Sequence, residues 1–95
     1  MPRAYWIAHI TVADPAAYEA YRSLGPGILA AHGGKYLVRA GAQEVVEGTA
    51  RPRTVIIEFP SLAAAQACYN SPEYQAAKAL RANASNGDLC IVEGV

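Results

Sequence analysis

The sequence lacks the features that mark several classes of protein. No apolar run approaches the roughly 18 residues that a membrane-spanning helix needs, and His9 interrupts the apolar segment near the N-terminus. Eight basic residues balance eight acidic ones, so the formal net charge is zero. Nucleic-acid surfaces and polybasic membrane patches both need an excess of positive charge. We therefore expect a soluble cytoplasmic protein that binds neither nucleic acid nor a membrane.

Cysteine and histidine are also scarce. Cys68 and Cys90 are the two cysteines and show no Cys-x-x-Cys spacing, while His9 and His32 stand at unrelated positions. A zinc site needs more ligands at closer spacing, so the thiols are expected to be small buried apolar groups. No dinucleotide fingerprint, phosphate loop or Gly-x-Ser-x-Gly motif occurs. We expect no metal and no cofactor.

The sequence contains the same structural plan twice, in which a strand is followed by a helix and then by a second strand. Apolar and β-branched runs indicate strands, and proline after a capping residue indicates helix starts. The predicted strands are residues 5–12, 36–40, 54–59 and 89–93, with a further short strand at 44–47; the predicted helices start at Asp14-Pro15, at Ser61 and at Ser71-Pro72. Pro26, between Gly25 and Gly27, is expected to kink or break the first helix and leave a short second piece at 28–32.

The order β-α-β-β-α-β predicts an α+β, ferredoxin-like sandwich with a four-stranded antiparallel sheet. Its 95 residues make a single domain, residues 1–95. In such a fold the helices cover one face of the sheet and leave the other face open. Hydrophobic residues make up 53% of the chain, so covering the open face with a second subunit would increase apolar burial.

The first strand has two different faces. Positions 6, 8, 10 and 12 are apolar and should pack under the helices, whereas His9 and Thr11 should face away from them. Arg39 and Glu58 could lie on the same face as His9. Together they would make a polar cluster in which a carboxylate raises the pKa of the imidazole and orients it as a base. The alternative is a set of polar residues that satisfy one another on a dimer-facing surface.

The segment His32-Gly33-Gly34-Lys35 allows two interpretations. It could be a loop whose backbone approaches a ligand, with His32 at the rim. It could equally be a helix C-cap, with His32 at the negative end of the helix dipole and Gly33 in a left-handed conformation.

Several tyrosines lie on or near the predicted helices: Tyr18, Tyr21, Tyr69 and Tyr74. Such a stripe packs in the core or lines a pocket between helices and sheet, where phenol groups orient a ligand. Arg51 and Arg53 precede the third strand and could attract an acidic ligand at a pocket mouth. The alternative for this pair is a solvated loop.

The combination of motifs resembles a known family. Tyr5-Trp6-Ile7-Ala8, His32-Gly33-Gly34, Ile57-Glu58-Phe59-Pro60-Ser61 and Ser71-Pro72-Glu73-Tyr74 occur in that order. With these motifs, nearly the whole chain resembles the domain-of-unknown-function 1330 family of the dimeric α/β-barrel superfamily. The resemblance implies a protomer whose open sheet packs on a second copy to close a barrel, and ligands between sheet and helices. Superfamily relatives include cofactor-independent monooxygenases and isomerases.

The first hypothesis is a homodimer, paired through the open sheet face, that binds a small, partly apolar metabolite between sheet and helices. Histidine residues and the tyrosines Tyr21, Tyr69 and Tyr74 would line the pocket, and Arg39 or Glu58 would orient the ligand.

Two further hypotheses stand beside it. One is a cofactor-independent enzyme of the isomerase or monooxygenase type, with His9 or His32 as general base and a tyrosine holding an oxyanion. The other is a structural or regulatory dimer without a ligand. A base close to a pocket would favour the enzyme, and a pocket without an acid–base pair would favour binding.

Overall fold

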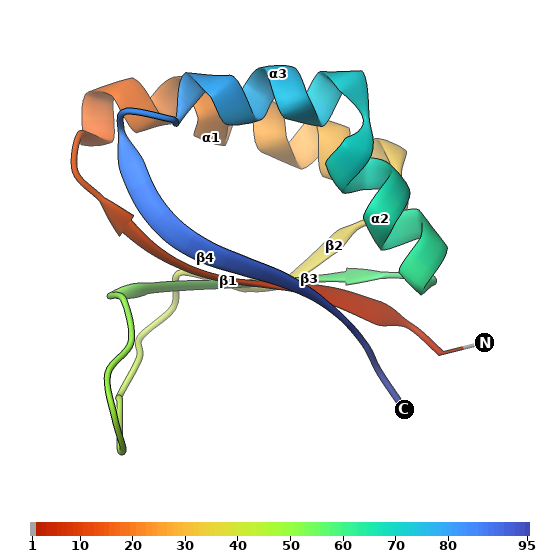
Figure 1. Cartoon of the computed structure of the whole chain (residues 1–95), viewed down its shortest axis with the longest axis horizontal. Helices are drawn as coiled ribbons and strands as arrows, with labels where there is room; N and C mark the ends of the chain where they lie inside the picture. Colours follow the sequence, from red (N-terminus) through yellow and green to blue (C-terminus); the bar gives the residue numbers. More distant parts are fainter. Residues whose placement is uncertain (1) are drawn as a thin grey trace.

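The computed structural model describes residues 2–95 and shows two layers, a sheet and a helical layer that covers one of its faces (Figure 1). In chain order the elements are β1 (Ala4–Val12), α1 (Pro15–Ala31), β2 (Lys35–Arg39), β3 (Arg53–Phe59), α2 (Leu62–Asn70), α3 (Pro72–Leu80) and β4 (Ser85–Glu93). The four strands are antiparallel to their neighbours in the order β2-β3-β1-β4. The predicted α+β, ferredoxin-like fold is confirmed. Within residues 2–95 no helix has the length and apolar character to cross a membrane.

The first helix is continuous, so the predicted break at Pro26 is wrong. The Asp14 carboxylate accepts a hydrogen bond from the Ala17 amide at 3.1 Å and caps the start of α1, which then runs through Pro26 to Ala31. Proline removes one backbone donor, but Gly25 and Leu29 on either side are buried. Packing of this face onto the sheet keeps the surrounding turns helical.

The last strand is longer than predicted. Residues 86 and 87 already lie within β4, which begins at Ser85. This strand pairs with β1 along its whole length, with Ser85 opposite Val12. A Cβ at Gly87 would come within 2.8 Å of the His9 carbonyl oxygen, so this glycine allows close approach of two strands. Residues 44–47 form no strand and belong to the long β2–β3 loop, which lies on the side of the sheet away from the helices (Figure 1).

The core lies between the sheet and the helices and is built on aromatic rings. Trp6, Phe59, Cys68 and Tyr74 have the largest fully buried side chains. The Trp6 indole nitrogen donates a hydrogen bond to the Ala65 carbonyl oxygen at 3.0 Å, which ties β1 to α2. The expectation that both thiols are buried therefore holds for Cys68 but not for the exposed Cys90.

A register shift in β2 changes which residues share a face. Tyr36 pairs with Ile57, but Arg39 pairs with Val55, because the register shifts between Tyr36 and Val38. One extra residue on β2 is a β-bulge, and it moves every later side chain to the opposite face. Arg39 therefore shares the inner, helix-facing side with Tyr36, although simple alternation would separate them.

Candidate functional site

A cavity lies between the inner face of the sheet and the helices α1 and α3. Its volume is about 90 Å³, which is well above the roughly 10–15 Å³ that a cavity needs to hold one water molecule. Its apolar walls come mainly from alternate positions of the strands: Trp6, Ala8, Ile10, Val55, Ile57 and Leu89.

The polar part of the lining is dominated by arginine. The cavity includes Arg22, Arg39, Arg53 and Arg81, from a chain with six arginines. Arg39 is exposed, whereas Arg53 and Arg81 are half-buried. The Nε atoms of Arg53 and Arg81 are buried and have no hydrogen-bond partner among residues 2–95. Buried polar groups are nearly always hydrogen-bonded, which makes these two atoms unusual.

Three of these guanidinium groups, those of Arg39, Arg53 and Arg81, face a tyrosine ring. The Arg39 guanidinium carbon lies 4.6 Å from the centroid of the Tyr36 ring. The corresponding distance is 5.6 Å for Arg53 over Tyr18. Such cation–π geometry stabilises a positive charge that is partly removed from water. The aromatic lining therefore keeps the arginines positioned without neutralising them.

The third arginine belongs to a hydrogen-bonded group. The hydroxyls of Tyr21 and Tyr74 are 2.8 Å apart, and Arg81 Nη2 donates to the Tyr74 hydroxyl at 3.3 Å. The Arg81 guanidinium carbon also lies 5.1 Å from the centroid of the Tyr21 ring. These contacts join α1 to α3 and fix the wall of the cavity on the helical side.

Burial raises the pKa of two tyrosines of the cavity wall, Tyr18 and Tyr21. Burial raises the pKa of Tyr21 well above its usual value, and the adjacent Tyr74 hydroxyl adds to the effect. Burial also raises the pKa of Tyr18, although the charges of Arg53 and Arg81 oppose it. A neutral phenol donates hydrogen bonds but is a poor base. These side chains are thus suited to hold an acceptor rather than to take a proton.

Acidic residues near the cavity have other partners. Asp88 borders it but pairs with Arg51 Nε at 3.3 Å on the opposite face. Arg22 pairs with Glu19 at 3.5 Å on the solvent side of α1. Among residues 2–95, no ion pair involves Arg39, Arg53 or Arg81. The cavity therefore carries an excess of positive charge in a chain whose net charge is zero.

The sequence-based candidates are divided between the two faces. Tyr21, Tyr74 and Arg39 line the cavity. Tyr69 does not, because its ring packs in the core with its centroid 5.8 Å from that of Trp6. Glu58 lies on the outer face, where its carboxylate is 3.7 Å from Arg3 Nε.

His9, Arg39 and Glu58 do not form a cluster, so the expectation that they converge is wrong. The bulge in β2 directs Arg39 to the inner face. His9 pairs with Thr54, and Glu58 pairs with Tyr5. Positions 54 and 58 are thus about 13 Å apart along β3.

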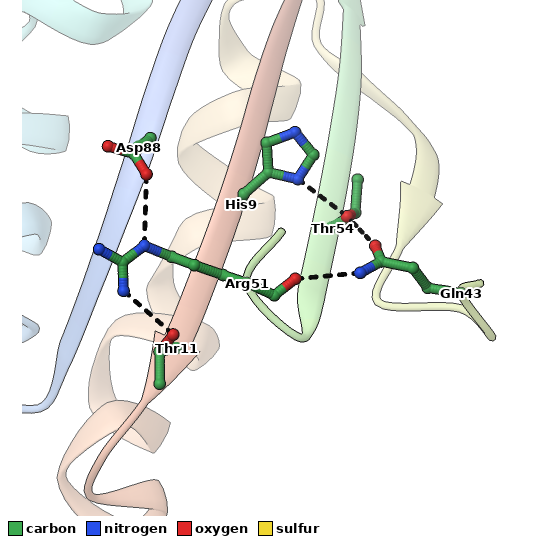
Figure 2. A network of polar contacts seen from close by, with 6 residues as sticks. All are labelled: His9, Thr11, Gln43, Arg51, Thr54 and Asp88. Carbon is green, nitrogen blue, oxygen red and sulfur yellow. Dashed lines mark hydrogen bonds and ion pairs between the residues drawn. The ribbon is translucent and has the colours of Figure 1, made fainter. Parts of the chain in front are cut away.

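His9 belongs instead to a network on the outer face, shown in Figure 2 with its partners Thr11, Gln43, Arg51, Thr54 and Asp88. Its Nδ1 is 3.0 Å from the Thr54 hydroxyl, which in turn donates to Gln43. The Gln43 amide donates to the Arg51 carbonyl oxygen at 3.0 Å. These contacts hold the β2–β3 loop against the sheet. His9 also borders a shallow hollow between this loop and β1.

His32 is the C-cap of α1, in agreement with the C-cap interpretation. Its Nδ1 is 3.1 Å from the Ile28 carbonyl oxygen, and Gly33 follows with a φ of 79°. His32 is not among the residues that line the cavity. Neither histidine lies where a cavity ligand would meet it.

Sequence reasoning did not propose Tyr36 or Arg81 as ligand-binding residues. It left Tyr18 either in the core or in a pocket lining, and Arg53 either at a pocket mouth or in a solvated loop. The structure places both Tyr18 and Arg53 in the cavity lining. One signal could have found Arg81. It follows Tyr74 by seven positions, and residues separated by two helical turns lie on one helix face. No group of three or more His, Cys, Asp or Glu side chains that could hold a metal occurs in the described part of the chain.

The sequence matches the model of the family described as "Domain of unknown function (DUF1330)" over residues 3–95. The chain belongs to the DUF1330 family. No protein of curated function matches this DUF1330 sequence. Solved structures show the fold. A protein of unknown function from Rhodopseudomonas palustris is 19% identical, with a TM-score of 0.79 over 99% of this chain and 83% of that one.

A second structure carries a described activity. SnoaB, a cofactor-independent oxygenase from Streptomyces nogalater, is 11% identical to the DUF1330 chain, with a TM-score of 0.67. The match covers 100% of this chain and 95% of SnoaB. At these identities the likeness shows a shared ferredoxin-like fold and leaves the activity to be argued from the site.

Proposed function

We propose that this DUF1330 protein binds a small, partly apolar molecule in the cavity between sheet and helices, and that it does so as a homodimer. The observation that carries the proposal is the cavity itself, with apolar walls from the strands and hydroxyl and guanidinium groups from Tyr21, Tyr74 and Arg81. Most ligand sites combine such apolar walls with a few polar groups that orient the ligand.

The cavity favours binding over general-base catalysis. Of residues 2–95, neither His9 nor His32 lines it, and burial raises the pKa of its tyrosines Tyr18, Tyr21 and Tyr36. A general base must lie within hydrogen-bonding reach of its substrate. The residues that line the cavity of this protein are therefore a better basis for its function than the oxygenase activity of SnoaB.

The outer face of the sheet supports the proposed dimer. One row of side chains crosses all four strands there, with Val38 opposite Ile56, Ile56 opposite Ile7, and Ile7 opposite Cys90. Val92, on the same face, is 43% exposed. A continuous apolar surface of this kind gains free energy when a second copy covers it.

A matched pair of substitutions tests the binding site. Ala8→Leu adds side-chain volume inside the cavity, whereas Ala67→Leu adds the same volume on the exposed side of α2. Thermal-shift screening against phenols, lactones and hydroxy acids should give stabilising compounds for the wild type and Ala67→Leu but not for Ala8→Leu. A ligand at 100 times its dissociation constant adds about 2.7 kcal/mol to the free energy of unfolding.

Compounds that stabilise Ala8→Leu as strongly as the wild type would show that binding occurs elsewhere. A fully silent screen of the folded wild-type dimer would favour the structural alternative instead. The two results are distinguishable because the first identifies a ligand and the second does not.

A further inference from the structure

We infer that the ligand of this cavity is a small organic carboxylate, bound by the guanidinium groups of Arg53 and Arg81, with its apolar part against the strands. This inference rests on the proposed function, because it assigns a chemical class to the ligand of the same cavity. It follows from three independent features of the lining: uncompensated charge, unpaired donors and an apolar floor.

The first feature is charge. Arg39, Arg53 and Arg81 converge on the cavity without an acidic partner among residues 2–95. The Arg53 guanidinium lies over the Tyr18 ring and the Arg81 guanidinium over the Tyr21 ring, and the centroids of these two rings are 5.4 Å apart. Like charges held together out of water repel each other and lose hydration. An anion between them would relieve both costs.

The second feature is the geometry of the free donors. Arg81 Nη2 already donates to Tyr74. Among residues 2–95, Arg81 Nε and Arg53 Nε have no hydrogen-bond partner, but both atoms are covered by protein, so the Nη groups are the donors that a ligand in the cavity can reach. The planar guanidinium presents its N–H groups as a fork that matches the two oxygens of a carboxylate. The Nη groups of two guanidinium groups that line one cavity are the donors that such a ligand would bind.

The third feature is the rest of the lining. Ala8, Ile10 and Leu89 give the sheet side of the cavity an apolar floor, and the Tyr18 ring adds an aromatic wall. An inorganic anion would leave this floor without contacts, whereas a carboxylate on an aliphatic or aromatic body uses both parts. The cavity volume of about 90 Å³ restricts the ligand to a small molecule.

Matched probes test the inference. Benzoate and benzamide have the same shape but differ in charge, as do hexanoate and hexanamide, and inorganic phosphate tests for a bare anion. Binding to the full-length protein is measured by isothermal titration calorimetry and by chemical shifts of the backbone amides. We expect each carboxylate to bind at least about tenfold more tightly than its amide, because charge-assisted hydrogen bonds are about twice as strong as neutral ones.

Substitutions assign the preference to residues. Arg53→Met and Arg81→Met should each weaken benzoate binding by about tenfold or more while leaving benzamide within about twofold. Arg3→Met removes the same charge from the outer face, where Arg3 pairs with Glu58, and should leave both probes unchanged. Arg53→Lys keeps the charge but loses the fork, and it should restore only part of the benzoate affinity.

Melting temperature separates a ligand-binding role from a structural one. If Arg53 stabilised the fold, Arg53→Met would lower the melting temperature of the free protein. We expect Arg53→Met to melt no lower than the wild type, because it removes a buried, unpaired donor from among like charges. The same variant should lose the stabilisation that benzoate gives to the wild type.

Four outcomes would overturn the inference. Equal affinity for acid and amide, or an acid preference that survives in both Arg53→Met and Arg81→Met, would refute the carboxylate while the proposed binding function stands. Phosphate that binds as tightly as benzoate would show a site for a bare anion. If neither the carboxylates nor their amide analogues change the chemical shifts of the backbone N–H groups around the cavity, the proposed function fails together with the inference.

Discussion

At the scale of single residues, Trp6 organises the core. Its ring centroid lies 4.9 Å from that of Tyr74 and 5.2 Å from that of Phe59, and its indole nitrogen donates to the Ala65 carbonyl oxygen. Tilted and edge-on contacts of this kind add stability beyond the area they bury. Because Tyr74 also carries the hydroxyl contacts of the cavity, the core directly positions the site.

Trp6→Phe should lower the free energy of unfolding by about 2 kcal/mol. The smaller ring leaves a void, and the buried Ala65 carbonyl loses its donor. Urea denaturation followed by circular dichroism measures the change. Tyr5→Phe, one position away on the outer face, should change stability by less than about 0.5 kcal/mol, and a similar loss in both variants would contradict the argument.

The buried phenols make stability depend on pH above about pH 10. Burial raises the pKa of Tyr18, Tyr21 and Tyr36 in the folded protein, whereas unfolded tyrosine has a pKa near 10. Above that pH the unfolded state loses protons that the folded state keeps. Stability that is fully present below pH 10 is then lost as the pH rises, by about 1.4 kcal/mol per pH unit for each such tyrosine.

Denaturant unfolding at pH 9.0, 10.5 and 11.0 measures this dependence. Tyr21→Phe should reduce the slope above pH 10, because phenylalanine has no proton to lose. A slope that is the same in the wild type and in Tyr21→Phe would show that Tyr21 does not contribute.

At the scale of elements, the glycines of α1 and of the turn that follows it differ in the space that surrounds them. Gly25 and Gly27 lie in α1, and Gly34 lies in the turn. Gly25 is buried, and a Cβ there would lie 3.7 Å from the Tyr36 hydroxyl. Gly27 is exposed, and a Cβ there would meet no atom within 4 Å. At Gly34 a Cβ would lie 2.9 Å from the Leu29 carbonyl oxygen and 3.0 Å from the Phe59 ring.

Gly27→Ala and Gly34→Ala should therefore have opposite effects. Gly27→Ala should raise the free energy of unfolding by about 0.8 kcal/mol, because alanine restricts the unfolded chain and favours helix. Gly34→Ala should lower it by at least about 1 kcal/mol, since the backbone oxygen and the buried ring cannot both move away. Chemical denaturation of both variants provides the test, and a stabilised Gly34→Ala would contradict the packing argument.

At the scale of the whole molecule, the two faces of the sheet have different roles. The helices close the inner face over the cavity, and the outer face presents the apolar row formed by Val38, Ile56, Ile7 and Cys90. If a second copy covers the outer face, assembly and ligand binding use opposite sides of one sheet and can be changed separately.

Ile7→Lys should convert the proposed dimer into a monomer at micromolar concentration, since it places a charge in the centre of the apolar row. Sedimentation velocity measures the change, with Ala67→Leu as control. Cys90 provides a second measurement. It is exposed in the protomer, so a thiol reagent should modify it faster in Ile7→Lys than in the dimer. Burial raises the pKa of Cys68 to about 11, which keeps that thiol unreactive. A wild type that sediments as a monomer would refute the dimer.

The sequence by itself determined the order of the elements and the apolar face of β1, because strand alternation and helix caps such as Asp14 and Ser71 are local features. It also selected Tyr21 and Tyr74 through their helical positions. Local signals misjudged Pro26, since packing of Gly25 and Leu29 against the sheet outweighs the cost of one missing hydrogen bond.

The composition of the site was decided only by the tertiary structure. A bulge of one residue in β2 turns Arg39 to the inner face, and sequence alternation carries no sign of it. Arg53 and Arg81 are far apart in the chain and meet only because β3 and the end of α3 border the same cavity. The convergence of positive charge is therefore a property of long-range packing, whereas the strands and helices that carry it follow from local sequence.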